Sequence, residues 1–256
     1  MNRTLLFAKR NIKELSRDVL SYIFCIAFPV VMLIIMSVLN ASIPKEAGMT
    51  TFRIDNLSGG IIVFGQTFVM LFTAMLVATD KGTSFLMRLY ATPMKSRHFT
   101  HGYIIPMLAV SIAQSLVAII SSVVISGISG VALNPLGLLL VVFTTLPSAL
   151  MFISIGMIFG TLFNEKAAPG LCSVIISLGT FLGGVFFDAE GIGGVMHTIC
   201  ECMPFLYCTR TARYSIRLEL DWAHFGSSFL IVSLVAAVLL ILATAVFNSR
   251  MKAESN

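Results

Sequence analysis

The sequence predicts an all-α polytopic membrane protein with six transmembrane helices, because both its composition and its apolar runs are typical of that fold class. Of the 256 residues, 57% are hydrophobic and only 11% are charged, and the mean hydropathy is +0.94. A soluble domain carries about 25% charged residues to cover its surface, so this composition excludes a water-surrounded core. The charge-free segments are apolar on every face, and a helix needs about 20 such residues to cross a bilayer.

Six predicted spans follow one another along a single transmembrane domain, which we assign to residues 1–256. They are residues 20–39, 57–79, 103–126, 136–163, 170–187 and 225–247. The third and fourth lie in one charge-free stretch, which Gly127, Gly130, Asn134 and Pro135 divide with a turn. Basic residues precede the first span, as in a signal peptide, but the apolar run is too long and no A-x-A cleavage site follows it.

Lysine and arginine are distributed unequally between the two sides of the predicted membrane. Twelve of the 17 basic residues fall on the side that holds both termini. Cytoplasmic loops retain positive charge, so we expect both termini of this multi-pass membrane protein in the cytoplasm. The net charge of +5 then follows from topology, and we expect no nucleic-acid partner.

Residues 2–19 predict an amphipathic helix that lies in the inner membrane interface, contacts lipid and runs into the first span. Apolar residues recur on one side of this helix and basic residues recur every four positions on another. The apolar positions are Leu5, Ile12 and Val19 together with Ala8 and Leu15, and the basic positions are Lys9, Lys13 and Arg17. The alternative is a charged tail in solvent, which the sustained periodicity disfavours.

Residues 80–101 form the longest polar connection on the inner side. The i,i+4 pairs Phe85 with Leu89 and Leu86 with Tyr90 predict a short helix with an apolar face. Thr92-Pro93 ends it, because the residue before proline disfavours helical geometry. An apolar face that is not needed for spanning favours docking to a cytoplasmic partner, and the alternative is a helix that rests on lipid.

Residues 188–224 are too apolar for a free loop, and their apolar stretch, residues 195–199, is too short to cross a bilayer. They therefore predict a re-entrant or interfacial helical hairpin on the outer side. It begins near Asp188, and Pro204 opens its second half. Arg210 and Arg213, with Arg217, form a basic row on the following helix. We favour anchors for outer-leaflet phosphates; the alternative is contact with an acidic substrate.

The polar side chains within the spans and the cysteines give weaker signals. Gln66 and Gln114 are the largest polar side chains inside spans, so they are candidates either for hydrogen bonds between helices or for a substrate path. Cys200, Cys202 and Cys208 allow a disulfide on the outer side. We expect no metal site, because no third ligand accompanies the C-x-C or H-x-x-H spacings.

Three stretches carry a resemblance to a known family. Residues 80–94, DKGTSFLMRLYATPM, resemble the cytoplasmic motif of ABC-2 type transporter permeases, in the subgroup that exports drugs and antibiotics. Residues 160–170, GTLFNEKAAPG, resemble the connection between spans four and five of these permeases, and residues 183–205 resemble the end of span five and the outer hairpin. The resemblance covers nearly the whole chain.

The resemblance implies a permease that pairs with a second copy or with a similar permease and docks on cytoplasmic ABC ATPase subunits. The residues that it implies for docking, in a coupling helix that the interfacial helix assists, are Thr83, Phe85, Leu86, Arg88, Leu89, Tyr90, Thr92 and Pro93. ATP and Mg²⁺ would then be bound by the partner, with no cofactor on this chain. The sequence agrees independently, since it contains no G-x-x-x-x-G-K-[ST] phosphate loop.

These observations predict a transport subunit, without an ATPase site of its own, that exports a hydrophobic or amphipathic substrate such as a drug, an antibiotic or a peptide. Export is expected because the sequence has no substrate-capture motif. The alternatives are a lipid or lipid-linked glycan exporter and a non-transporting scaffold or sensor. An intramembrane hydrolase is disfavoured, because all four histidines lie outside the predicted spans and there is no G-x-S-x-G motif.

Overall fold

A computed structural model describes residues 3–44, 50–83, 96–187, 189 and 193–255 of the chain. The regular elements of these residues are all helical, and η1 and η3 are single π-helical turns. In chain order they are α1 (Arg3–Leu15), α2 (Val19–Tyr22), η1 (Ile23–Ala27), α3 (Phe28–Ser42), α4 (Ile54–Gly82), α6 (Ser96–Ser129), α7 (Pro135–Thr144), α8 (Leu146–Leu162), α9 (Ala168–Leu182), α10 (Gly194–Cys202), α11 (Pro204–Arg217), η3 (Trp222–Gly226) and α12 (Ser227–Ser255).

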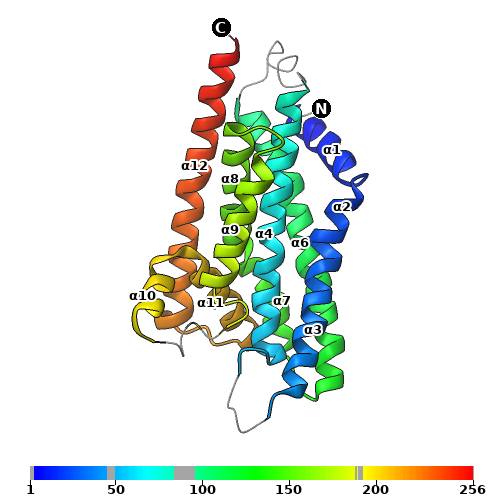
Figure 1. The fold of residues 1–256 in the computed structure, drawn as a ribbon, viewed down its shortest axis with the longest axis vertical. Coiled ribbons are helices and arrows are strands. Elements are labelled where there is room, and N and C mark those ends of the chain that lie inside the picture. Colours follow the sequence, from blue (N-terminus) through cyan, green and yellow to red (C-terminus); the bar gives the residue numbers. More distant parts are fainter. Residues whose placement is uncertain (1–2, 45–49, 84–95, 188, 190–192, 256) are drawn as a thin grey trace.

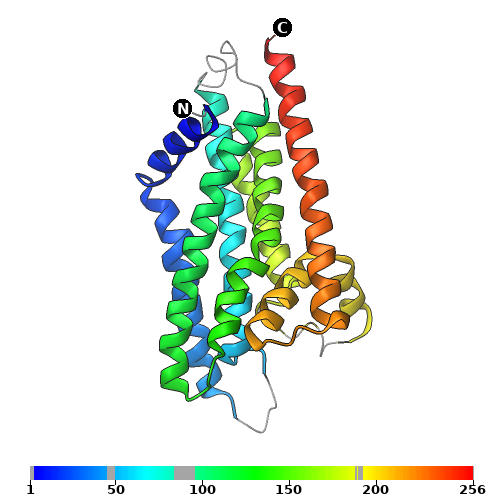
Figure 2. The same cartoon turned by 180° about the vertical axis from the view of Figure 1, so that it is seen from behind.

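The long helices form an elongated bundle around α4 (Figure 1). At one end α1 tilts away from the bundle axis, and both chain termini lie at this end, which we call the α1 end. The short helices α10 and α11 lie across the opposite end, which we call the α11 end, as the view from behind also shows (Figure 2). The chain enters α4 at the α11 end and leaves it at the α1 end.

Five helical segments of the described chain are long and apolar enough to cross a membrane. They are Val19–Ser42, Ile54–Gly82, His98–Ser129, Pro135–Leu162 and Trp222–Arg250. The predicted span 170–187 instead overlaps α9, a helix of 15 residues, or about 22 Å at 1.5 Å per residue. Six full-length spans are therefore not confirmed. The helix ends early because Gly184 adopts φ +63°, a left-handed conformation that terminates helices.

Two of the spanning segments are interrupted at prolines. Pro29 cannot donate a backbone hydrogen bond to Cys25 four residues earlier, and the π-helical turn η1 accommodates this loss just before α3. Pro147 has the same effect in the fourth segment, where α7 ends at Thr144 and α8 begins at Leu146. The fourth predicted span is therefore two helices joined at Thr145.

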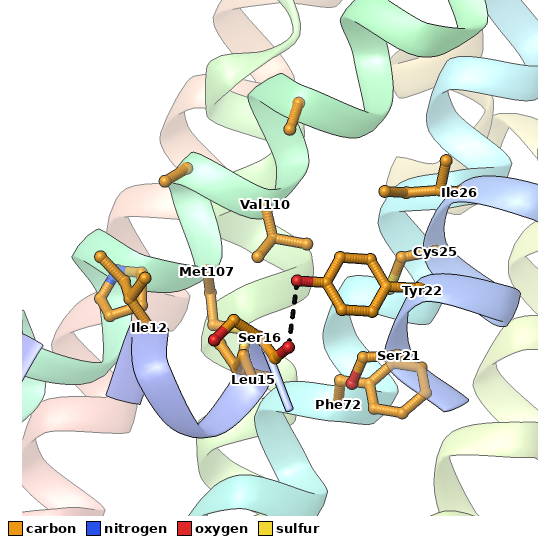
Figure 3. A pocket seen from close by; sticks show the side chains of 13 residues that line it. Ile12, Leu15, Ser16, Ser21, Tyr22, Cys25, Ile26, Phe72, Met107 and Val110 are labelled. Atoms are coloured by element: carbon orange, nitrogen blue, oxygen red, sulfur yellow. Dashed lines mark hydrogen bonds between the residues drawn. The ribbon is translucent and has the colours of Figure 1, made fainter. Parts of the chain in front are cut away.

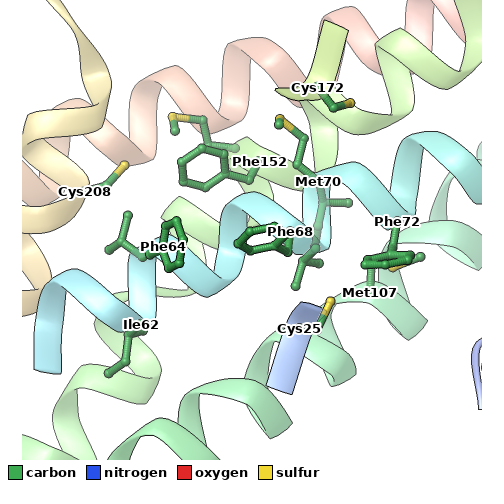
Figure 4. Close-up of a cluster of buried hydrophobic side chains, with 14 of the residues drawn as sticks. Cys25, Ile62, Phe64, Phe68, Met70, Phe72, Met107, Phe152, Cys172 and Cys208 are labelled. Atoms are coloured by element: carbon green, nitrogen blue, oxygen red, sulfur yellow. The ribbon is translucent and has the colours of Figure 1, made fainter. Parts of the chain in front are cut away.

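Aromatic side chains of α4 form the centre of the hydrophobic core (Figure 4). Phe64, Phe68 and Phe72 recur every four residues, so they lie along one face of the helix. The Phe68 ring stacks on Phe24 with centroids 5.8 Å apart and meets Phe28 edge to face at 5.5 Å. These contacts attach the first spanning segment to α4.

The backbone of α8 approaches that of α4 closely through two glycines. A Cβ atom at Gly156 would overlap the carbonyl oxygen of Met70, and a Cβ at Gly160 would overlap that of Ala74. Glycines four residues apart lie on one side of a helix and allow close packing in membranes, where dispersion rather than water exclusion drives helix association. Any larger side chain at either position must separate the two helices.

We expect Gly156→Val to destabilise the protein by about 1–3 kcal/mol, the usual cost of overpacking, because the added methyl groups meet the α4 backbone. The measurement is the melting temperature of the purified chain in detergent. Gly127→Val is the control, since Gly127 lies in α6 and a Cβ atom added there would have no neighbouring atom within 4 Å. Equal decreases for both variants would contradict the packing argument.

Candidate functional site at the α1 end

Residues 84–95 connect α4 to α6, and seven of the eight predicted docking residues fall among them. Phe85, Leu86, Arg88, Leu89, Tyr90, Thr92 and Pro93 therefore lie outside the described residues. Thr83 is described and closes the end of α4, where its backbone N–H donates to the carbonyl oxygen of Thr79 at 3.0 Å. The helices on both sides of this connection are described, so the structure defines the points at which it leaves and re-enters the bundle.

A buried carboxylate occupies the last turn of α4, three residues before Thr83. Asp80 is 1% exposed. Its Oδ2 atom accepts hydrogen bonds from the Arg10 guanidinium at 2.6 Å and from the Tyr103 hydroxyl at 2.8 Å. Arg10 belongs to α1 and Tyr103 to α6, so one side chain joins three helices. Charge-assisted hydrogen bonds of this length are the strong kind.

The guanidinium of Arg10 also binds a second carboxylate, Glu14, at 2.6 Å within α1. Burial lowers the pKa of Arg10, but the hydrogen bond and charge of Asp80, together with the charge of Glu14, raise that pKa above its ordinary value. The pKa of Glu14 is also raised, mainly by burial and further by Asp80, against the lowering effect of Arg10. Arg10 therefore stays fully charged between two carboxylates.

Apolar and amide contacts hold the rest of α1 against α6. The Asn11 side-chain amide donates to the carbonyl oxygen of Gly102 at 3.0 Å. The Phe7 ring packs edge to face on Tyr103, with centroids 5.0 Å apart, and on Phe99 at 5.7 Å. A Cβ atom at Gly102 would overlap the Phe7 ring, so only glycine leaves room for this contact.

The predicted interfacial helix differs from the observed one in length and in its buried face. It ends at Leu15 and does not continue into the first span, because the Asp18 side chain accepts from the backbone N–H of Leu20 and caps α2. Of the predicted apolar residues, Leu15 is buried, whereas Leu5 and Ile12 are 56% and 46% exposed. The exposed basic residues are Lys9, Lys13 and Arg17.

The end of α4 is held on a second side by α8 and the turn that follows it. The Lys81 ammonium donates to the carbonyl oxygens of Thr161 at 2.9 Å and Phe163 at 3.1 Å, at the C-terminus of α8. A cation there satisfies carbonyls that have no helical partner. The Thr79 hydroxyl donates to Glu165 at 3.1 Å. The point where residues 84–95 leave the bundle is thus attached to α1, α6 and α8.

Sequence reasoning missed this junction, because it treated Asp80 as the first residue of a polar connection and assigned no role to Arg10 beyond its contribution to the charge of the N-terminal segment. The signal in the sequence was weak. Asp80 follows directly on an apolar run, and Tyr103 with its hydroxyl stands at the start of the next. Nothing in the spacing indicates that Arg10, 70 residues earlier, supplies the opposite charge.

The α11 end contains the described residues of the predicted outer hairpin, while Asp188 lies outside the described residues. Pro204 occupies the first turn of α11. Arg213 donates to the carbonyl oxygens of Asn56 at 3.1 Å and Gly184 at 2.8 Å, which ties α11 to the start of α4 and to the end of α9. Arg210 lies 3.8 Å from Glu201. The anchoring of phosphates by this row stays a prediction.

The two glutamines of the predicted substrate path both lie buried between helices. Gln66 donates to the carbonyl oxygen of Thr145 at 3.2 Å and accepts from the Ser148 hydroxyl at 2.5 Å, so it bridges the break between α7 and α8. Gln114 donates to the carbonyl oxygen of Ile62 at 3.4 Å and fills the space beside Gly65. The positions of the two glutamines do not show whether substrate passes between these helices.

The structure also bears on cysteine and metal chemistry. All five cysteines lie in the described part of the chain, and all are free thiols. The side chains of the described residues include no group of three histidine, cysteine, aspartate or glutamate residues that could hold a metal ion. The features that remain for a functional site are therefore the polar junction at the α1 end and the arginine row at the α11 end.

Comparison with protein families bears on the identity of the chain. A profile described as ABC-2 type transporter matches residues 2–217. This range includes α1, the junction around Asp80, the connection over residues 84–95 and the helices through α11, and it leaves η3 and all of α12 beyond its end. No curated protein matches the chain.

We expect Asp80→Asn and Arg10→Gln each to destabilise the protein by about 1–3 kcal/mol, the cost of leaving a charged hydrogen-bonding group without its partner. The double variant should lose less stability than the two single variants together, because the second substitution removes a group whose partner is already gone. Melting temperatures in detergent measure this coupling. The same double-mutant cycle on Arg53 and Asp55, a more exposed pair at the α11 end, should be closer to additive. Additive effects of the Asp80 and Arg10 substitutions would contradict a direct interaction between them.

Proposed function

This chain belongs to the ABC-2 type transporter family, and from that premise we propose that it is the permease subunit of an ATP-driven exporter. Permeases of this family form the membrane component and work with separate ABC ATPase subunits. The chain is accordingly a multi-pass membrane protein, as its five long apolar helices also indicate. Export, rather than uptake, is our inference, as are the bacterial cell membrane and the cytoplasmic position of both termini.

The observation that carries the proposal is the junction at the end of α4. In our proposal residues 83–93 form the coupling helix that docks on the ATPase, and ATP binding closes the ATPases and displaces this helix. Three residues before Thr83, Asp80 binds Arg10 of α1 and Tyr103 of α6, and Lys81 binds the end of α8. A displacement of the coupling helix would therefore reach α1, α4, α6 and α8 together.

The chemistry of α4 supports a hydrophobic or amphipathic cargo, such as a drug, an antibiotic or a peptide. Between its first turn and Asp80 this helix carries no charged residue, and phenylalanines dominate one face. This face is buried within the chain, so it indicates an apolar interior rather than a surface that contacts substrate, and an apolar interior does not offset the desolvation of a strongly charged substrate. A second copy of the chain, or a similar permease, would complete the pathway. Lipid or lipid-linked glycan export is the second candidate, since these cargoes are also amphipathic.

We predict that replacing Leu86 and Leu89 together with Asp abolishes association with the ATPase while the spans stay folded, because two carboxylates would be buried in the docking interface. The measurement is co-purification of a phosphate-loop ATPase with the tagged chain from its native membrane. The matched control replaces both residues with Ile, which keeps the apolar face. Undiminished co-purification of the Asp variant would exclude residues 83–93 as the docking helix.

We also predict that hydrophobic compounds stimulate ATP hydrolysis by the purified complex, and that Asp80→Asn reduces this stimulation although the ATPase stays bound. The physical reason is that the substitution removes the charge that joins α1 and α6 to α4. Glu219→Gln at the α11 end is the control, because Glu219 is half exposed and pairs only loosely with Arg217 at 3.7 Å. A chain that purifies without any ATPase would instead support the scaffold or sensor alternative.

A further inference from the structure

A pocket of about 250 Å³ lies in the angle between α1 and the first spanning segment (Figure 3). Leu15, Cys25, Phe72 and Met107 form its buried floor. The rim is exposed and includes Ile12 of α1, which contributes an aliphatic side chain at the opening. The pocket therefore opens to the outside of the bundle, beside α1.

Hydroxyl groups are the only side-chain oxygen or nitrogen groups of the pocket lining, and they belong to Ser16, Ser21 and Tyr22. Tyr22 donates to the carbonyl oxygen of Ser16 at 3.4 Å, and this bond crosses the angle between α1 and α2 (Figure 3). Ser21 donates to Asp18 at 2.6 Å. The hydroxyls of Tyr22 and Ser21 are thus already used within the protein, and the remaining surface suits an apolar occupant.

The chain forms this space by two local features. Helix α1 ends after Leu15, and the Asp18 cap then starts a new helix, so α1 and α2 diverge. On the opposite wall α6 presents Pro106, Ala109 and Ala113. These side chains are too small to reach across the gap, so a space remains between α6 and the first spanning segment.

The occupant has to come from the membrane. An ordered water needs about 2–4 polar partners, and the Ser21 and Tyr22 hydroxyls of this apolar lining are already engaged within the protein. Apolar residues near the opening are exposed, including Leu20 at 53% and Leu116 at 47%. In a membrane protein such residues face hydrocarbon, and the pocket is continuous with that surface. A single acyl chain matches this lining.

The charge beside the opening indicates an acidic lipid. Lys13 and Arg17 directly follow the pocket residues Ile12 and Ser16, and both are exposed. Within the described part of the chain they have no ion-pair partner. The carboxylates nearby are engaged elsewhere, because Glu14 pairs with Arg10 at 2.6 Å and Asp18 accepts from Leu20 and Ser21. The local field therefore favours a phosphate.

We propose that this pocket binds one acyl chain of an anionic phospholipid, whose phosphate lies against Lys13 and Arg17. The lipid fixes the angle between α1 and the first span, because its chain packs on both. Since α1 also carries Arg10, the bound lipid supports the attachment of α1 to Asp80. This binding requires only that the chain lies in a membrane. The lipid-binding proposal is therefore tested separately from the proposed transport.

The test uses the delipidated full chain in detergent, with phosphatidylglycerol and phosphatidylcholine that carry identical acyl chains. Native mass spectrometry measures binding and the melting temperature measures stabilisation. Phosphatidylglycerol should bind with about tenfold higher affinity and raise the melting temperature more. Glycerol phosphate without acyl chains should give no shift, and a shift of equal size would overturn the role of the pocket.

Two pairs of variants distinguish lipid binding in the pocket from lipid binding elsewhere on the membrane-facing surface. Ala109→Phe fills the pocket and should remove the tightly bound lipid, whereas Ile120→Phe, on the exposed face of the same helix, should not. Replacing Lys13 and Arg17 with Gln should reduce the affinity for phosphatidylglycerol to that for phosphatidylcholine, while Lys166→Gln with Arg250→Gln leaves it unchanged. Equal behaviour within either pair of variants, or equal binding of the two lipids by the wild-type chain, would overturn the proposal.

Discussion

A carboxylate that is removed from water needs hydrogen-bond donors, because a buried charged group that loses its partner costs about 1–3 kcal/mol or more. Asp80 imposes this constraint on the α1 end of the bundle, and the positions of three helices follow from it. Arg10 can reach Asp80 only if α1 lies across the end of α4, and Tyr103 reaches it only if α6 begins beside that end. The contacts of Phe7 and Asn11 then complete an interface whose orientation Asp80 has already set.

The same requirement governs the places where helices end inside the bundle. Backbone carbonyls released by a helix terminus need donors wherever water is scarce. Lys81 serves this purpose at the end of α8, and Arg213 does so in the turn after α9. Two polar side chains that look unrelated in the sequence therefore have one physical role in the structure.

The location of the spans could be predicted from the sequence, because a charge-free apolar run is a property of neighbouring residues. Their ends could not be predicted equally well. The predicted second span stops at Thr79, whereas α4 continues to Gly82, because Asp80 and Lys81 find partners that are distant along the chain. The predicted fifth span is longer than α9, because hydrophobicity does not indicate the left-handed conformation of Gly184.

The N-terminal helix shows a second limit of sequence reasoning. Its periodicity correctly indicates an amphipathic helix, but two apolar rows compete, and periodicity does not distinguish a row that faces protein from one that faces lipid. Ala8 and Leu15 pack on the protein together with Phe7 and Asn11, while Leu5 and Ile12 stay exposed. Asn11 belongs to the buried face because Gly102 offers it a carbonyl oxygen, a fact that only the tertiary structure contains.

The close glycine contacts between α8 and α4 restrict how this protein can change shape. A sliding motion of one helix past the other would bring larger side chains of α8 to the positions where only glycine fits, so α4 and α8 resist sliding. On the other side of Thr145, α7 is fitted just as tightly to α11, since a Cβ atom at Gly137 would overlap the carbonyl oxygen of Ile216. Thr145, the single residue between α7 and α8, therefore separates two closely packed pairs of helices, and Gln66 donates to its carbonyl oxygen.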